Sequence, residues 1–247
     1  MRAALEALLR EKHLDGTLPP ALAPAADRVA ATGCARVDAA LGGGLRRGQL
    51  SEIVGVPSSG RSTLLAHALA AATADRAEAA ALVDASDTFD PASAAVRGVD
   101  LTRLLWVRPS TGLGTAPDAG APARALKAYS LILQAGGFGL VVLDLADVAP
   151  APVRRLPWTT WMRLARMVEG SDTVALLVGS ERLARSAGGA TILLEPAAVR
   201  WQGSAARARL FAGVDLAPRV TGNSQLPTPQ SARIDTCDRI PAEVSGR

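Results

Sequence analysis

The feature that most constrains this chain is an eight-residue segment, 55–62, with the sequence Gly-Val-Pro-Ser-Ser-Gly-Arg-Ser. It follows an apolar run at 50–54 and precedes helix-forming residues at 61–74. Glycines here let the backbone wrap an anion with its N–H groups, and the N-terminus of the following helix adds a favourable field. The context predicts a phosphate-binding loop between a strand and a helix. Its candidate contact residues are Gly55, Ser58, Ser59, Gly60, Arg61 and Ser62.

Arg61 departs from this motif, which expects lysine at that position. Lysine is a slim point charge that reaches terminal phosphates, whereas arginine carries a planar fork that needs more room. The only lysines are Lys12 and Lys127, so a general drift from lysine to arginine is one explanation, but drift does not remove the steric problem. We expect nucleotide binding to be weakened or lost, with near-normal binding as the alternative. Ser62 is still present to hold Mg²⁺ if a nucleotide enters.

Short apolar runs alternate with helical runs from residue 49 onward. Strands are expected at 50–54, 81–83, 104–107, 140–145, 174–178 and 192–194, and helices at 61–74, 124–134 and 158–168. Short apolar strands separated by helices imply a mostly parallel, twisted sheet with helices on both faces. The expected fold class is therefore α/β.

The N-terminal part of the chain differs from this core in composition. Residues 1–14 place Leu5, Leu8 and Leu9 at helical spacing with charges between them, which predicts a short amphipathic helix. Residues 15–28 contain a glycine and three prolines, which predicts a linker. The helix is therefore expected to form an arm that is set apart from the core.

The core is expected over residues 29–217. Beyond the last parallel strand, residues 197–201 and 207–214 are compatible with antiparallel strands at the edge of the sheet. Residues 218–247 are rich in Thr, Asn, Ser, Gln and Pro with isolated charges, and we expect this tail to be disordered.

The composition indicates the compartment in which the chain works and the kinds of partner that its charge permits. It has no uninterrupted apolar run of about 18 residues, so a transmembrane helix is not expected. The N-terminus lacks the apolar region of a signal peptide, which favours the cytoplasm, and Cys34 and Cys237 form neither a disulfide framework nor a metal site. The net charge of +4 permits contact with nucleic acid or acidic proteins, and a solvated basic surface is an equally good explanation.

Several further segments resemble the RecA recombinase family. Residues 32–33, 41–45 and 48–55 are similar to the family's lead-in to its first core strand. Residues 82–91 are similar to its second strand, 98–101 to the turn into its third strand, and 140–144 to its Walker B strand. The resemblance spans about 29–194 and implies a RecA-like P-loop core.

Four positions depart from the family's pattern. Besides Arg61, Ser86 stands where the glutamate that activates the attacking water is expected, two positions after Asp84. Ser110 replaces an acidic residue in the turn that touches adenine, and Ser180 replaces a glutamine that senses the γ-phosphate. A serine hydroxyl cannot act as a base near pH 7. The resemblance thus implies a degenerate ATPase, not an enzyme, that has no catalytic residue, requires no cofactor and binds ATP and Mg²⁺ weakly at most.

Asp144 ends the expected strand 140–145 and matches the Walker B acid of the resembled family. It could orient Mg²⁺ through water if a nucleotide binds. Equally, it is a polar residue that closes a buried strand. Both interpretations stay open from the sequence, and no protein-held metal site is expected.

Two segments, 147–160 and 180–189, resemble the family's DNA-binding loops, and both are short. Arginine beside tryptophan can stack bases and neutralise phosphates, but the same residues are frequent anchors of protein interfaces. We expect weak or no direct DNA binding. The candidate contact residues are Arg154, Arg155, Trp158, Trp161, Arg182 and Arg185.

Within the family, a core of this size with short loops, a detached N-terminal helix and an eroded ATPase site most resembles the ImuA group. That group is the RecA-related component of the inducible mutagenesis cassette. The resemblance implies an accessory role in error-prone translesion DNA synthesis during the SOS response to DNA damage. The implied partners are RecA and ImuB, with an error-prone C-family DNA polymerase engaged indirectly.

Three functions stay open. The first is a non-catalytic adaptor or regulator whose arm, through Leu5, Leu8 and Leu9, docks on a RecA subunit and stops filament growth, unless the arm folds back onto its own core. The second is a slow DNA-dependent ATPase that forms its own filament. The third is a cell-division inhibitor, which would have to bind a tubulin-like polymer, and no feature of the sequence points to that.

Overall fold

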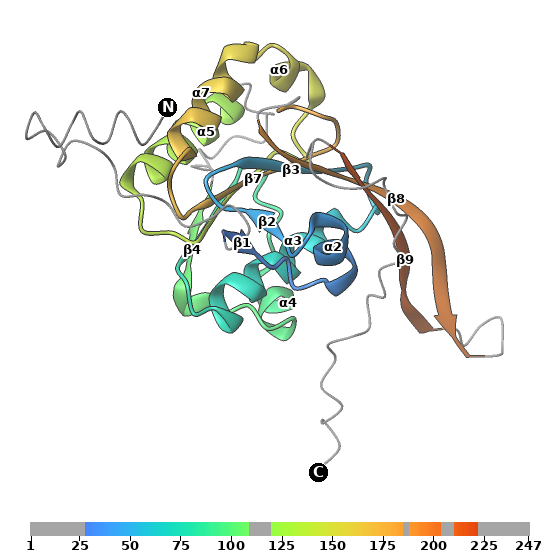
Figure 1. The fold of residues 1–247 in the computed structure, drawn as a ribbon. Helices are drawn as coiled ribbons and strands as arrows, with labels where there is room; N and C mark the ends of the chain where they lie inside the picture. The colour runs from blue at the N-terminus through green and yellow to red at the C-terminus, as the bar shows by residue number, and fades with distance from the viewer. Residues whose placement is uncertain (1–27, 109–119, 185–187, 204–209, 222–247) are drawn as a thin grey trace, which may run out of the picture.

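The computed structural model describes residues 28–108, 120–184, 188–203 and 210–221, which form the ribbon in Figure 1. Its main sheet has the strand order β5-β4-β6-β7-β3-β8-β9. All neighbours pair in parallel except β8 and β9, which are antiparallel. The strands are β3 (Leu50–Gly55), β4 (Ala80–Asp84), β5 (Leu104–Val107), β6 (Leu140–Asp144), β7 (Val174–Gly179), β8 (Gly188–Gln202) and β9 (Leu210–Thr221). The predicted α/β class with a mostly parallel sheet is confirmed.

Helices cover both faces of this sheet, as Figure 1 shows. One face carries α2 (Ala35–Leu41), α3 (Arg61–Ala70), its π-helical continuation η3 (Ala71–Asp75) and α4 (Pro91–Val96). The other face carries α5 (Ala121–Ala135), α6 (Pro150–Arg154) and α7 (Trp158–Val168). A single 3₁₀ turn, η4 (Leu101–Arg103), precedes β5, and β1 (Val29–Ala30) pairs with β2 (Leu45–Arg46) in a separate small sheet.

Two apolar cores result, one on each face. Successive side chains of a strand point to opposite faces, so Leu140 and Val142 of β6 join the core under α3, whereas Val141 and Leu143 join the core under α5 and α7. The four side chains are at most 2% exposed. A strand buried on both faces is mostly apolar, which explains why the sequence of β6 does not alternate.

The expected strands at 50–54, 81–83, 104–107, 140–145 and 174–178 all occur, with ends that differ by no more than one residue. The expected helices at 124–134 and 158–168 also occur, and α5 is a few residues longer. The helix expected at 61–74 is α3 followed by η3, so its last turn widens into a π-helix.

The C-terminal edge of the sheet differs from the expectation in two ways. The short strand expected at 192–194 and the edge strand expected at 197–201 are one continuous strand, β8, with a register shift between Pro196 and Ala198. The strand expected at 207–214 is β9, which runs on to Thr221, so placing the start of the tail at 218 was wrong. Residues 218–221 pair with Leu194 to Thr191 instead.

Several expectations fall outside the described residues. These are the arm 1–14 with Leu5, Leu8 and Leu9, nearly all of the linker 15–28, Ser110, Arg185, and the tail from 222 onward. Across the described ranges, no helix is both long enough and apolar enough to cross a membrane. Cys34 is a free, buried thiol.

Candidate nucleotide site and the neighbouring groove

The loop predicted to bind phosphate lies between β3 and α3, as the sequence indicates. Ser59 N–H donates to the Val56 carbonyl at 3.1 Å, which closes a tight turn. Gly60 has φ 86° and Ser58 has φ 63°, a left-handed conformation that is strained for a residue with a side chain. A Cβ on Gly55 would lie 2.1 Å from Ser59 Oγ, so this position has room only for glycine.

Arg61 closes this loop on itself. Its side chain is only 5% exposed, and Nη1 donates to the carbonyl of Gly55 at 2.8 Å. Nη2 donates to Oδ1 of Asp147 at 2.5 Å, in the segment after β6. Arg61 is thus bonded back to Gly55, the residue that begins the loop, and a second bond ties it to the segment that follows β6. We name this arrangement the Arg61 latch.

Two acidic residues, one buried and one partly buried, lie beside the latch at the carboxyl end of the sheet. Asp84 ends β4 and Asp144 ends β6, and the two residues are register partners. Burial, together with the nearby carboxylates of Asp84 and Asp147, raises the pKa of Asp144 to about 6, although the N–H of Ala146 and the charge of Arg61 act in the opposite direction. Ionised Asp144 is therefore unfavourable in the folded protein.

The acidic residues in the turn after β4 are all committed to local structure. Asp84 is 2% exposed and accepts the N–H groups of Ser86 at 3.1 Å and Phe89 at 2.9 Å. Asp87 forms a two-bond ion pair with Arg108, and Asp90 caps α4 by accepting two backbone N–H groups. A general base needs a carboxylate that is directed at the attacking water. This turn holds Ser86 at the expected position and no such carboxylate.

These residues do not fit a bound nucleotide with Mg²⁺ in the arrangement described. Ser62 is exposed on the first turn of α3 and could reach a metal ion. However, the guanidinium of Arg61 is hydrogen-bonded across the loop that a phosphate would have to enter. Within the described ranges, no group of three or more His, Cys, Asp or Glu side chains is arranged to hold a metal ion.

Glu52, in the middle of β3, has a structural role that the sequence did not single out. It is 2% exposed and accepts three hydrogen bonds, from the N–H of Leu183 at 2.9 Å, the N–H of Ala184 at 3.0 Å and the hydroxyl of Thr191 at 2.6 Å. These bonds hold the segment after β7 against the central strand. An acidic residue inside an apolar strand was the signal, because a buried carboxylate needs donors.

That segment forms one wall of a groove of about 690 Å³. Residues of α6, α7 and their connection form the other wall, and Arg154 joins the two walls through a bidentate ion pair with Glu181, with both closest contacts at 2.8 Å. We name it the α6–α7 groove. Its lining residues are Val153, Arg154, Leu156, Trp158 and Trp161 on one side and Glu181, Arg182 and Leu183 on the other.

The structure thus brings together most of the residues proposed to contact DNA or a partner. Trp158 is 46% exposed, whereas Trp161 is 4% exposed and packs in the core. The segment 147–160, which resembles a DNA-binding loop of the family, contains α6 and the start of α7. Ser180 lies at the end of β7, next to the same wall.

Replacing Asp144 with asparagine is expected to stabilise the fold by on the order of 1–2 kcal/mol at pH 8. Because the pKa is raised from 3.8 to about 6, the folded protein binds this proton more tightly than the unfolded chain does. The penalty is therefore complete above pH 6 and disappears as the pH falls toward 4. Urea unfolding of both proteins at pH 8 and pH 4 measures this, and a gain of equal size at both pH values would contradict it.

Comparisons with known proteins give one consistent result. The RecA N-terminal domain family matches residues 24–153, more than half of the chain. Similar curated proteins include Protein RecA of Chlorobaculum tepidum, 39% identical over 118 residues, and Protein RecA of Clavibacter michiganensis subsp. michiganensis, 41% identical over 115 residues. The matches cover 47% and 46% of this chain but only 31% and 28% of those proteins. The chain thus matches less than a third of the length of these relatives.

Proposed function

The chain belongs to the RecA family, and we propose that it is a non-catalytic, RecA-like accessory protein of SOS-induced, error-prone translesion DNA synthesis. In this role it acts in the cytoplasm as an adaptor or regulator that contacts RecA and ImuB, and through them an error-prone C-family polymerase. This is the role of the ImuA group, which the chain resembles in its short loops and altered ATP site.

The observation that carries this proposal is the Arg61 latch. A phosphate that enters the loop has to displace a charge-assisted hydrogen bond to the Gly55 carbonyl, which is worth about 1.5–3 kcal/mol, together with the contact to Asp147. Asp147 is 45% exposed, so its ion pair adds less than the buried bond does. The latch therefore favours the nucleotide-free state.

Ser86 supports the same conclusion independently. Even a nucleotide that binds would meet no water-activating carboxylate in the turn after β4, because Asp84, Asp87 and Asp90 are all held in other contacts. The latch acts on nucleotide binding, whereas the missing base acts on the hydrolysis that would follow. Their combination favours a protein that works through contacts rather than through turnover.

A slow DNA-dependent ATPase that forms its own filament is the second candidate. It is favoured by the intact glycines of the loop, by exposed Ser62 and by Asp144 at the end of β6. It differs from the adaptor in one measurable property, because it has to hydrolyse ATP in the presence of single-stranded DNA. An adaptor that stops RecA filaments needs no hydrolysis of its own.

Replacing Leu5, Leu8 and Leu9 together with glutamate is expected to abolish the inhibition of RecA filament growth by this protein. The proposed arm contact buries three apolar side chains, and charges at these positions would oppose that burial. Filament length on single-stranded DNA, measured by electron microscopy with RecA and the full chain, is the readout. Unchanged inhibition by the variant would remove the arm as the contact, and no inhibition by the natural protein would contradict the regulatory role.

A further inference from the structure

The α6–α7 groove combines an apolar floor with a basic rim. Leu156 and Leu183 are partly exposed along it, and Trp158 presents almost half of its surface at the start of α7. Large apolar side chains that stay accessible inside a groove are typical of binding sites, because burying them against a ligand is favourable.

The arginines of this rim differ in how far their charge is neutralised. Arg154 is fully engaged by the carboxylate of Glu181. Arg182 is exposed and donates to the hydroxyl of Thr221 at 2.8 Å, a neutral acceptor that leaves its positive charge uncompensated. Arg155 is not itself part of the lining, but it is exposed and lies in the chain between the lining residues Arg154 and Leu156. Among the described residues neither Arg155 nor Arg182 has a carboxylate partner.

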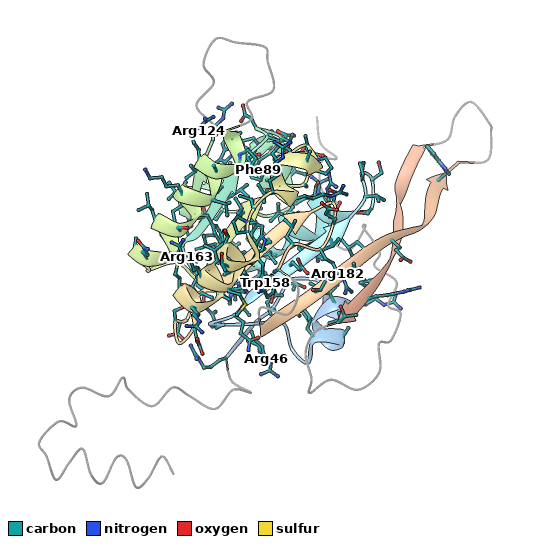
Figure 2. All side chains as sticks on the ribbon, turned by 90° about the horizontal axis from the view of Figure 1, so that it is seen from above. Arg46, Phe89, Arg124, Trp158, Arg163 and Arg182 are labelled. Atoms are coloured by element: carbon teal, nitrogen blue, oxygen red, sulfur yellow. The ribbon has the colours of Figure 1, made fainter. Side chains whose placement is uncertain are left out.

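The positive charge continues along α7. Arg163 and Arg166 lie on its exposed side and have no ion pair with any described residue. In the projection of Figure 2, Trp158 lies between Arg163 and Arg182. The exposed side of α7 therefore adds positive charge to this part of the molecule.

The walls of the groove are fixed before anything binds. The Arg154–Glu181 ion pair joins them, and Glu52 accepts hydrogen bonds from the N–H groups of Leu183 and Ala184. A preformed site loses little conformational entropy on binding, so weak contacts at its rim still contribute to affinity.

We propose that the α6–α7 groove binds an acidic segment of a partner protein, with its carboxylates held by Arg155 and Arg182 and an apolar side chain seated against Trp158. Charge complementarity selects the occupant. The uncompensated groups are guanidiniums, which bind carboxylates with two parallel hydrogen bonds. This inference builds on the adaptor function proposed above, because it gives the chemistry of one partner contact.

Single-stranded nucleic acid fits the same groove less well. Such ligands stack successive bases on exposed aromatic rings along a basic path. Here only Trp158 is exposed, since Trp161 is 4% exposed in the core.

The test uses the full chain and a short fluorescein-labelled peptide of repeating Glu-Glu-Leu, with fluorescence anisotropy as the readout. We expect saturable binding that weakens at least tenfold in the double variant Arg155→Glu with Arg182→Glu, and weakens again when the peptide carries Gln in place of Glu. Arg36→Glu is the matched control, because Arg36 is exposed on α2 over the opposite face of the sheet, and it should bind like the natural protein. Circular dichroism checks that each variant is folded.

Three results would overturn the inference. The first is the absence of peptide binding by the natural protein, and the second is equal binding by the charge-reversed variant. The third is tighter binding of a labelled oligothymidylate that the same two substitutions abolish, which would make the groove a nucleic-acid site. None of these results concerns ATP turnover or RecA inhibition, so the groove can fail while the proposed function stands. Rapid ATP hydrolysis would instead contradict the proposed function and leave the peptide measurement unaffected.

Discussion

Replacing Arg61 with lysine is expected to tighten ATP binding by about tenfold to a hundredfold while hydrolysis stays at background. Arg61 uses two nitrogens of its fork to hold the Gly55 carbonyl and Asp147 at once. A lysine is slimmer, has a single nitrogen and leaves room for the phosphates that its ammonium attracts. Titration with a fluorescent ATP analogue and Mg²⁺ measures the affinity, and phosphate release measures hydrolysis.

Two further variants separate the parts of this effect. Asp147→Asn weakens the latch but keeps the guanidinium of Arg61, so it should raise ATP affinity less than Arg61→Lys does. Arg61→Ala removes the latch and the positive charge together, so its ATP affinity should be lower than that of Arg61→Lys. If Arg61→Lys binds ATP no better than the natural protein, the guanidinium is not what keeps the nucleotide out.

Replacing Glu52 with alanine is expected to destabilise the fold by about 3–5 kcal/mol, which is a large fraction of the stability of a typical domain. The substitution leaves the N–H groups of Leu183 and Ala184 and the hydroxyl of Thr191 without their acceptor, in a position that is 2% exposed. Urea unfolding at pH 7 measures the change in the free energy of unfolding. Loss of the three hydrogen bonds should also release the wall of the α6–α7 groove that contains Leu183.

Glu195→Ala is the matched control for this prediction. Glu195 is an exposed glutamate of β8 that forms an ion pair with Arg219 at 3.8 Å, and surface pairs of this kind contribute little. We expect a change within about 0.5 kcal/mol. A Glu52→Ala variant that unfolds at the same urea concentration as this control would show that the three hydrogen bonds do not hold the segment.

The parallel core was predictable from sequence because its physical signal is local. Strand β6 is a run of four apolar residues that ends in Asp144, and a continuous apolar run is typical of a strand that is buried on both faces. Helix α6 was missed because Pro150 and Pro152 suggest a loop, although proline is tolerated in the first turn of a helix. Pro196 lies between the strands expected at 192–194 and 197–201, and β8 accommodates it with a shift in register.

The site was predictable only in part. The loop and Ser86 could be read from the motif and its resemblance to a family, because both depend on residues close together in sequence. The Arg61 latch could not, since Asp147 lies 86 positions away and only the parallel pairing of β6 with β7 and of β7 with β3 brings it to the loop. The bond between Arg154 and Glu181 has the same origin, because the fold joins segments that the sequence keeps apart.

The most direct test of the account is an ATPase assay of the purified natural chain with Mg²⁺ and single-stranded DNA. A loop closed by its own arginine, followed by a turn without a general base, predicts phosphate release no faster than in the Arg61→Ala variant. Rapid, magnesium-dependent hydrolysis by the natural chain that Arg61→Ala abolishes would contradict it.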